Sequence, residues 1–271
     1  MAVRQPVFFI PHGGGPCFFM PPRPGTPADL WDRMAAFLRG IMATLPERPK
    51  AILVISGHWE EPVPTVNSAA HPGLRFDYYG FPPHTYELTY PVPGDPDLAA
   101  RVRGLLGNAG FGTAEDDQRG LDHGVFIPFK LVVPEADIPL VQLSLITGMD
   151  PAKHGTMGRA LMALRDEGVL IVGSGMSYHN LRLAFIDHPA ANAASMAFDG
   201  WMVEAVTDVD PAARDAKLAR WAEAPGGREC HPREEHLIPL MVAAGAGDAD
   251  RGQHVYADVL MGKAYSGFRF G

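Results

Sequence analysis

The sequence predicts an α/β fold, a single domain with a central, mostly parallel sheet that is flanked by helices on both faces. Continuous apolar runs of strand length recur along the chain, and each is bounded by Gly, Pro or His. Such runs are typical of strands that are buried on both faces of a sheet. Between them lie longer stretches whose apolar residues recur with helical spacing. The repeated order of strand, helix and strand indicates parallel strands joined by crossover helices.

Four apolar runs predict the buried strands of this sheet. They are VFFI at 7–10, AILVIS at 51–56, IPLVQLSL at 138–145 and VLIVGSG at 169–175. Three shorter segments are further strand candidates: PTVNSA at 64–69, YELTY at 86–90 and HVYADVLM at 254–261.

Helices are predicted between the strands. The stretches with helical spacing are 28–45, 95–108, 125–132, 151–166, 191–209, 211–222 and 232–244. Several of them open with a proline in the first turn or with an aspartate before it, as helices often do. We expect the carboxyl ends of the strands, where an open α/β sheet binds its ligands, to carry the functional site.

Composition permits a large core and narrows the class of partner. The chain has 271 residues, of which 46% are hydrophobic, so residues 1–271 can fold as one catalytic domain without a disulfide or metal staple. A formal net charge of −8 argues against nucleic acid or an anionic membrane as the main partner, because those surfaces attract basic patches. We therefore expect a small-molecule substrate; the sequence does not indicate the oligomeric state.

Cysteine content and the N-terminal sequence bear on localisation. Cys17 and Cys230 are the only cysteines, too few for a disulfide framework. The first apolar run ends at Pro11 and is too short for a signal peptide or a membrane span. We expect a cytoplasmic protein.

Three histidines follow predicted strands. His12 follows VFFIP, His58 follows AILVISG and His179 follows VLIVGSGMSY. At the carboxyl ends of parallel strands these side chains would share one crevice, and the three glycines after His12 would let backbone and ligand approach closely. A phosphate-binding loop is the competing interpretation of GGG, but no Lys, Ser or Thr follows in the required register. A single histidine in such a place is more often structural; three together favour a site.

Two further histidines are candidates. His236, in CHPREEHLIPL, lies near the start of a predicted helix. Imidazoles from several segments suit a divalent transition metal, although their spacing matches neither a zinc finger nor HExxH. His123, in RGLDHGVFIPF, precedes an apolar helix and follows Asp122. A neighbouring carboxylate can orient an imidazole for acid and base chemistry, and a helix-capping role is equally consistent.

Other side chains could contribute to a substrate pocket. The block from 77 to 94 could supply aromatic walls, or could simply pack, through Tyr78, Tyr79, Phe81, Tyr86 and Tyr90. Glu60 could support a ligand. Asn180 and Arg182 could bind a carboxylate, or could cap a helix and form a surface ion pair.

Six sequence motifs occur along the chain in an order that matches a known protein family. They are HGGGP, SGHWE, DYYGFPPHTYELTYPVPG, LDHGVFIPF, GSGMSYHNLR and HPREEHLIPL. In this order the chain resembles the LigB-like class III extradiol ring-cleaving dioxygenases, and in particular their 4,5-DOPA extradiol dioxygenase branch. The resemblance extends from Phe8 to the terminal YSGFRF.

The resemblance implies a non-haem Fe(II) centre, with Zn(II) often present in isolated members. By motif, His12, His58 and His236 correspond to the metal ligands. His179 corresponds either to a fourth ligand or to an acid/base residue, and His123 corresponds to the other catalytic histidine. The implied reaction inserts both atoms of O2 into the ring of a catechol and yields a muconic semialdehyde.

Some features of the resemblance leave alternatives open. Protocatechuate-type members use a glutamate as third ligand, so Glu235 or Glu234 is the fallback for His236. The family's first loop is often HGSP, and the additional glycine here leaves the shape of the pocket open. The alternatives to the dioxygenase are a zinc hydrolase, with Glu60 or Glu235 as base, and a non-catalytic binding protein of the same fold.

Overall fold

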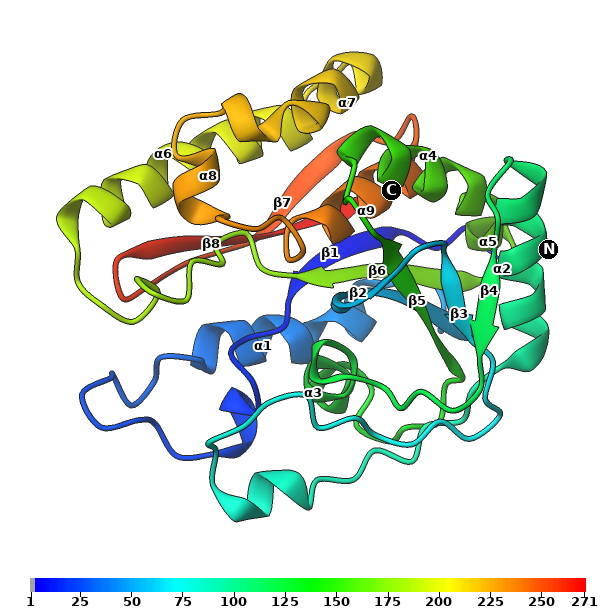
Figure 1. The fold of residues 1–271 in the computed structure, drawn as a ribbon, viewed down its shortest axis with the longest axis horizontal. Helices are drawn as coiled ribbons and strands as arrows, with labels where there is room; N and C mark the ends of the chain where they lie inside the picture. The colour runs from blue at the N-terminus through cyan, green and yellow to red at the C-terminus, as the bar shows by residue number, and fades with distance from the viewer. Residues whose placement is uncertain (1–2) are drawn as a thin grey trace.

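The computed structural model describes residues 3–271 and is built around one sheet of eight strands (Figure 1). Their order is β4-β3-β5-β2-β6-β1-β8-β7. The strands are β1 (Val7–Pro11), β2 (Ala51–Glu61), β3 (Thr65–Asn67), β4 (Ala114–Asp116), β5 (Leu140–Ile146), β6 (Val169–Gly175), β7 (Gly252–Leu260) and β8 (Lys263–Phe270). The central strands β5, β2, β6 and β1 run parallel, whereas β8 joins β1 antiparallel and forms a hairpin with β7. The predicted α/β class with a mostly parallel sheet is confirmed.

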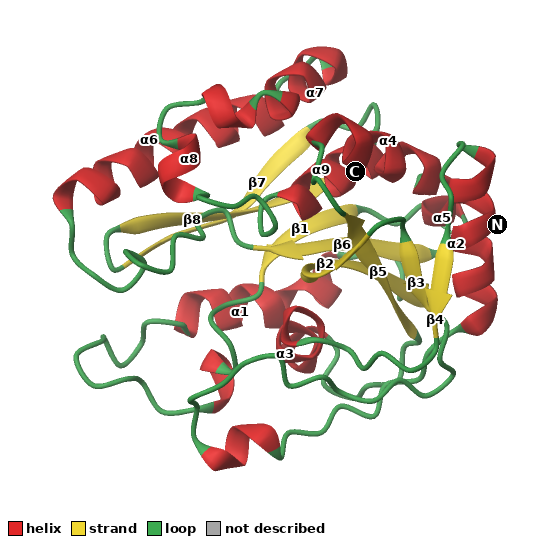
Figure 2. Ribbon diagram, in the orientation of Figure 1, coloured by secondary structure: helices red, strands yellow, loops and turns green. Residues whose placement is uncertain are grey.

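Helices cover both faces of this sheet (Figure 2). They are α1 (Asp32–Gly40), α2 (Pro96–Asn108), α3 (His123–Val132), α4 (Pro151–Leu161), α5 (Ala163–Asp166), α6 (Pro189–Val206), α7 (Pro211–Ala219), α8 (Gly227–Cys230) and α9 (Ile238–Gly247). Four 3-10 helices complete the set: η1 (Cys17–Phe19), η2 (Ile41–Thr44), η3 (Pro83–Tyr86) and η4 (Trp221–Glu223). On one face α9 packs on β1, β2 and β6 and is itself covered by α4, while α1 and α3 lie on the other face.

The central elements of the fold are buried and have predominantly apolar sequences. Every residue of β5 and β6 is buried, as expected for central parallel strands covered on both faces. All ten residues of α9 are buried as well, and its sequence IPLMVAAGAG has no polar side. A helix that is apolar all round must be enclosed, and here the sheet and α4 enclose it.

The four apolar runs that predict central strands are all strands. The run at 51–56 continues further than predicted, because β2 extends to Glu61. Of the shorter candidates, 64–69 contains β3 and 254–261 overlaps β7, but 86–90 is wrong. There the chain leaves η3 as a loop, and Tyr90 is buried with its hydroxyl donating to the carbonyl of Val133 at 3.0 Å.

Each predicted helical stretch contains a helix, with shifted ends. The stretch at 28–45 begins as a helix only at Asp32 and finishes as the 3-10 helix η2. The stretch at 232–244 becomes helical only at Ile238. Strands β4 and β8 and the short helix α8 are not predicted by the sequence patterns. Within residues 3–271, the helices are all too short or too polar to span a bilayer.

Candidate metal centre

A cavity of about 780 Å³ opens at the carboxyl ends of β1, β2 and β6. All five histidines singled out from the sequence line it: His12, His58, His123, His179 and His236. They come from five segments that are far apart in the chain. The structure therefore brings together every histidine that the sequence predicts for the site.

Two of the histidines are placed by strands. His12 directly follows β1, and its backbone N–H donates to the carbonyl of Gly175 at the end of β6, at 3.2 Å. His58 was expected beyond the end of its strand, but it lies inside β2. The pairing of β2 with β6 stops at Ser56, and pairing with β5 resumes at Glu60 after an irregular stretch. His58 occupies that irregular stretch, which turns its side chain toward the cavity.

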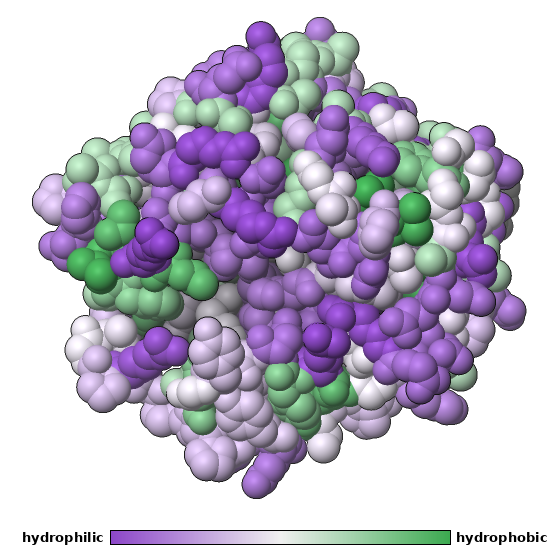
Figure 3. Space-filling model, viewed as in Figure 1, coloured by the Kyte–Doolittle hydropathy of each residue, from purple (hydrophilic) through white to green (hydrophobic). Residues whose placement is uncertain are grey.

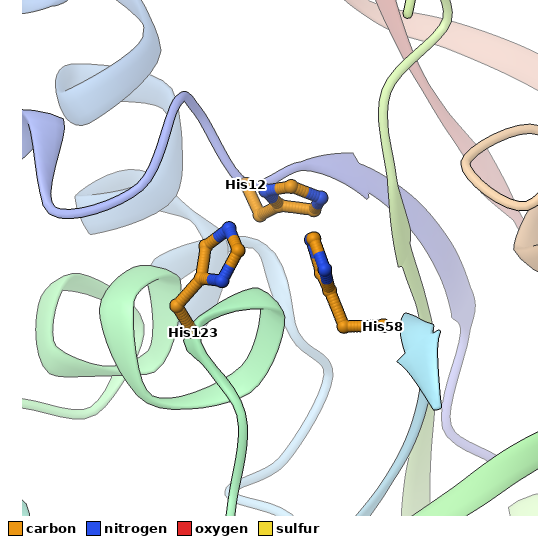
Figure 4. A group of neighbouring side chains, drawn as sticks. All are labelled: His12, His58 and His123. Carbon is orange, nitrogen blue, oxygen red and sulfur yellow. The ribbon is translucent and has the colours of Figure 1, made fainter. Parts of the chain in front are cut away.

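The other three histidines lie outside the sheet, on segments that follow strands in the sequence or at the start of a helix. His123 is the first residue of α3, and His179 lies four residues beyond β6. His236 precedes α9, and its carbonyl accepts from the backbone N–H of Met176 at 3.0 Å. This carbonyl packs so closely on Gly175 that a Cβ there would collide with it. Figure 4 shows His12, His58 and His123 converging from β1, β2 and α3.

The ligand atoms of these side chains are close together. Within each of two groups, the donor atoms lie within 4.8 Å of one another: His12, His58 and His123, and His179, Glu235 and His236. The two groups meet where Nε2 of His58 lies 3.1 Å from Nε2 of His236. The ring centroid of His12 is 4.9 Å from that of His58 and 5.2 Å from that of His236.

Asp77 contacts two histidines of the first group. Its Oδ1 accepts from Nδ1 of His123 at 2.7 Å and from the backbone N–H of His123 at 2.9 Å, and its Oδ2 is 3.5 Å from Nδ1 of His58. Burial alone raises the pKa of Asp77, but the hydrogen bond from His123 and the nearby imidazoles lower this pKa to about 2. A carboxylate only accepts hydrogen bonds, so Nδ1 of His123 carries the proton and Nε2 is left for chemistry.

Glu235 likewise contacts both histidines of the second group. Its Oε1 accepts from Nδ1 of His179 at 3.1 Å and from Nδ1 of His236 at 3.0 Å. Burial is the largest single influence on Glu235 and raises its pKa, but the hydrogen bond from His179, a backbone hydrogen bond and the charges of His179 and Arg233 together lower this pKa below its usual value. The two imidazole rings are stacked, with centroids 3.3 Å apart. Each carboxylate thus lies between two imidazoles.

His12 provides a test of whether these residues fit a metal ion. The residue is 1% exposed, and neither ring nitrogen has a hydrogen-bond partner in the described part of the chain. A buried polar group without a partner costs about 1–3 kcal/mol. Coordination of an ion would satisfy one of these nitrogens, whereas a purely structural role leaves both unexplained.

The neighbouring donors fit a metal ion as well. Since Nδ1 of His236 donates to Glu235, its Nε2 presents a lone pair to Nε2 of His58, and their 3.1 Å separation suits two nitrogens bound to one ion at about 2.1 Å. Burial, reinforced by the neighbouring imidazoles, lowers the pKa of His12, His58 and His236 well below its usual value. Neutral imidazoles are the form that binds divalent transition metals. The donor set therefore fits such an ion.

Asp122 does not orient His123, contrary to the expectation from sequence. Its Oδ1 accepts from the hydroxyl of Ser56 at 2.7 Å, and its Oδ2 accepts from Arg119 at 3.1 Å and from the amide of Gln142. It caps no backbone N–H of α3 through its side chain. This buried network joins β2, β5 and the start of α3, so Asp122 supports the backbone that carries the imidazoles.

The sequence did not single out Asp77, which lies in the proline-rich segment after β2 and has no local pattern. Of the aromatic block, Tyr78, Tyr79 and Phe81 line the cavity, but Tyr86 and Tyr90 do not. Asn180 and Arg182 are also absent from the lining of this cavity. The amide of Asn180 instead donates to the carbonyl of Glu229 at 2.8 Å. Glu60 pairs with Arg233 rather than with a histidine.

Known proteins resemble this chain over most of its length. The family model for the catalytic LigB subunit of aromatic ring-opening dioxygenase matches residues 6–268. The dioxygenase tasH of Hapsidospora irregularis is 40% identical, over 95% of this chain and 82% of its own. The 4,5-DOPA dioxygenase extradiol of Beta vulgaris is 43% identical over 74% of each chain. That of Escherichia coli is 34% identical, over 91% of this chain and 87% of its own.

A solved structure shares the fold. The crystal structure of an uncharacterized protein from Escherichia coli K12 superposes with a TM-score of 0.77 at 30% identity. The superposition covers 99% of this chain and 100% of that one.

Proposed function

The chain belongs to the family of the catalytic LigB subunit of aromatic ring-opening dioxygenases and is a ring-cleaving dioxygenase, and from this premise we propose that it is a non-haem Fe(II)-dependent extradiol enzyme that cleaves a catechol. The single observation that carries the proposal is the buried His12 imidazole, which lies beside the rings of His58 and His236 and whose two nitrogens have no hydrogen-bond partner among residues 3–271. The extradiol names of the relatives support the same chemistry.

In this proposal His12, His58 and His236 hold the metal ion. Nε2 of His58 lies 3.1 Å from Nε2 of His236, and the ring of His12 lies 4.9 Å and 5.2 Å from these two rings, centroid to centroid. Fe(II), when bound, supplies the electron transfer between catechol and O2 that no protein side chain provides. Three neutral ligands leave further positions for the two substrates. Zn(II) prefers the same imidazoles and could occupy the site in a purified sample.

The remaining two histidines move protons. Nδ1 of His123 is held by the Asp77 carboxylate, so its Nε2 can accept a proton from a catechol hydroxyl and the resulting imidazolium is stabilised. Nδ1 of His179 is held by Glu235, so its Nε2 can deliver a proton to oxygen as the ring opens. We therefore keep His179 as an acid/base residue and not as a fourth ligand.

The overall reaction balances without an external reductant. One carbon–carbon bond of the ring, adjacent to a hydroxyl-bearing carbon, breaks, and both atoms of O2 enter the muconic semialdehyde. We also propose that residues 1–271 act as one catalytic domain, because β1 pairs with β8 at the opposite end of the chain and the cavity lining extends to Tyr265. The two buried, unpaired cysteines support the cytoplasm as its compartment.

An anaerobic reconstitution tests the proposal. The apoprotein is loaded with Fe(II) or with Zn(II), mixed with a panel of catechols and exposed to oxygen. We expect a yellow ring-fission product and one O2 consumed per catechol with Fe(II), and neither with Zn(II). No oxygen uptake across the panel would refute the dioxygenase and leave the zinc hydrolase or a binding protein.

Variants test the division of roles. His12→Ala, His58→Ala and His236→Ala should abolish metal retention, measured by metal analysis after dialysis. His123→Ala should retain the metal and lose turnover by about 100-fold, the scale of a general acid or base. His71→Ala is the matched control, because His71 is exposed and lies outside the cavity lining. Loss of metal from the His123 variant would overturn this assignment.

A further inference from the structure

The part of β2 that carries His58 is not held by pairing with the neighbouring strands. Pairing of β2 with β6 ends at Ser56, and pairing with β5 is interrupted between Ile55 and Glu60. Within the described chain, residues 57–59 therefore have no register partner on either side. Backbone N–H and C=O groups that are shielded from water require hydrogen-bond partners, so side chains must supply what the sheet does not.

Two side chains bond the backbone of His58 instead. Its N–H donates to Oγ of Ser56 at 3.1 Å, and its carbonyl accepts from Nη2 of Arg119 at 3.2 Å. Both side chains are joined in turn to Asp122. Oγ of Ser56 donates to Oδ1 of this carboxylate at 2.7 Å, and Nη2 of Arg119 donates to Oδ2 at 3.1 Å. One connected network therefore fixes both polar groups of the His58 main chain.

Trp59 provides a further contact for Arg119. The guanidinium carbon lies 4.6 Å from the ring centroid of Trp59, which is 2% exposed. Nε1 of Trp59 donates to Oε1 of Glu61 at 2.9 Å, so the indole is itself fixed. A planar guanidinium can stack on an aromatic ring and donate several hydrogen bonds from its edge, whereas an ammonium group is a compact charge without a flat face. This set of contacts therefore favours arginine over lysine.

The backbone of Arg119 is anchored at the edge of the sheet. Its N–H donates to Oδ1 of Asp116, the last residue of β4, at 2.9 Å, and its carbonyl accepts from the amide of Asn67, the last residue of β3, at 2.5 Å. The same segment continues into α3 at His123, whose ring centroid is 3.9 Å from that of His58 (Figure 4). Arg119 therefore holds His58 from the segment that also carries His123.

The ion pair of Arg119 and Asp122 lies where an ion pair contributes little to stability. Hydrophilic residues cover much of the face shown in Figure 3, whereas the side chains of Arg119 and Asp122 are only 9% and 0% exposed. The loss of hydration of two buried charges offsets much of their attraction, so a buried pair is weak evidence for a stabilising role. The bond from Arg119 to the carbonyl of His58 gives this pair a role in geometry.

We propose that Arg119 is a positioning residue for the metal centre, because it fixes the backbone of His58 and so sets the direction from which this imidazole approaches the ion. Arg119 is absent from the lining of the cavity, so it acts on the ion only through His58. The inference rests on the proposed function, in which His58 is a metal ligand. Replacement of residues that orient metal ligands typically weakens metal binding by about 10- to 100-fold.

Metal titrations of the apoprotein test this role without turnover. Competition with a chromogenic chelator gives the Zn(II) dissociation constant, and the visible absorption of the anaerobic, Co(II)-saturated protein reports the geometry of the ligands. Arg119→Met keeps an unbranched side chain and removes the guanidinium, so it should raise the Zn(II) dissociation constant about tenfold and change the Co(II) spectrum. Arg119→Lys keeps the charge beside Asp122 but not the stacked, forked donors, so its dissociation constant should rise only about threefold.

Arg103→Met is the matched control. Arg103 pairs with Glu115 of β4 at the surface, where the two side chains are 36% and 54% exposed, and it lies outside the cavity lining. The control removes the same charge beside the same strand and should leave the dissociation constant and the Co(II) spectrum unchanged.

The positioning role is overturned if Arg119→Met is folded by circular dichroism and keeps the Zn(II) affinity and the Co(II) spectrum of the wild type. A lower urea midpoint with an unchanged Co(II) spectrum would also overturn it, since that is the result of a merely structural role. If Arg119→Met does not fold, Arg119→Lys decides by the same two measurements.

The ligand assignment is tested separately with His58→Ala. Unchanged Zn(II) affinity of His58→Ala would refute His58 as a ligand, and with it both the proposed metal centre and the role of Arg119. Loss of metal from His58→Ala together with tight binding by Arg119→Met would refute the role of Arg119 alone.

Discussion

Removing the negative charge of Asp77 and removing that of Glu235 should have different effects on metal affinity and turnover. Asp77→Asn and Glu235→Gln keep the size of each side chain and its carbonyl oxygen but remove the negative charge. Asp77 bonds the proposed proton-transferring histidine, with Oδ1 2.7 Å from Nδ1 of His123, and is 3.5 Å from the proposed ligand His58. Glu235 bonds the proposed ligand His236 directly, at 3.0 Å, and His179 at 3.1 Å.

The magnitudes follow from these bonds. A hydrogen bond to a charged group is worth about 1 kcal/mol more than a neutral one, and about 1.4 kcal/mol is tenfold in a rate or affinity. Asp77→Asn should lower kcat of the metal-saturated enzyme about fivefold, which corresponds to about 1 kcal/mol. Its effect on metal affinity should be small, because 3.5 Å is too long for a strong bond to His58. Glu235→Gln should weaken metal affinity about tenfold and lower kcat as well, in line with other residues that support metal ligands.

Two assays separate these effects. Competition with a chromogenic chelator gives the metal dissociation constant, and oxygen uptake at saturating metal gives kcat. Glu204→Gln, on the exposed side of α6 and paired only with Lys217, is the control for removal of a carboxylate charge. Our reasoning is refuted if Asp77→Asn releases metal as readily as Glu235→Gln, or if the metal-saturated Asp77 variant keeps the kcat of the wild type.

Three further predictions concern stability. Arg165 is 1% exposed and donates to the carbonyls of Gln5, at 2.8 Å, and Ala246, at 3.1 Å, so Arg165→Met should cost about 3 kcal/mol in urea unfolding. Arg101→Met is the control, because it breaks an exposed ion pair and should leave the urea midpoint nearly unchanged. Burial lowers the pKa of His231 from 6.5 to about 4, so the unfolded chain binds the proton more tightly than the folded chain. As the pH falls from about 6.5 to 4, this difference should lower the free energy of unfolding by about 3 kcal/mol. The free energy of unfolding of His231→Gln should fall by less over that range. Chelation should lower the Tm of the metal-loaded protein but leave the Tm of His12→Ala unchanged, because a ligand stabilises only a fold that binds it.

The sequence predicts the central strands of this fold well and its edges poorly. The run at 169–175 matches β6 residue for residue, because a strand buried on both faces is predominantly apolar. Strand β8 is not predicted: its sequence KAYSGFRF mixes charged, small and aromatic residues, and it is a strand because β1 and β7 pair with it. The strand expected at 86–90 fails for the opposite reason: Tyr86 ends η3 and is exposed, and Tyr90 is buried although it lies in a loop.

The residues of the candidate site were also predictable only where they lie next to strands that the sequence marks. The imidazoles could be predicted because His12 and His179 follow strands that the sequence marks clearly, and the sheet alone brings them together. Asp77 could not be predicted, because it lies 46 residues from His123 in an irregular segment, and only the folded chain sets them side by side. The expectation that Asp122 orients His123 was wrong for a related reason, because adjacency in the sequence does not determine where the Asp122 carboxylate points.

The pairing of each carboxylate with two imidazoles links metal binding to proton transfer. Because Asp77 and Glu235 each occupy Nδ1 of one of the two proposed acid/base histidines, the Nε2 atoms of His123 and His179 are the nitrogens left for a substrate, and both histidines line the cavity. A proton taken from the catechol by one histidine and a proton returned by the other can therefore be exchanged within the same cavity. Glu235 also bonds His236, so a shift of this carboxylate would move a proposed metal ligand and a proposed proton carrier together, whereas Asp77, 3.5 Å from His58, acts mainly on His123.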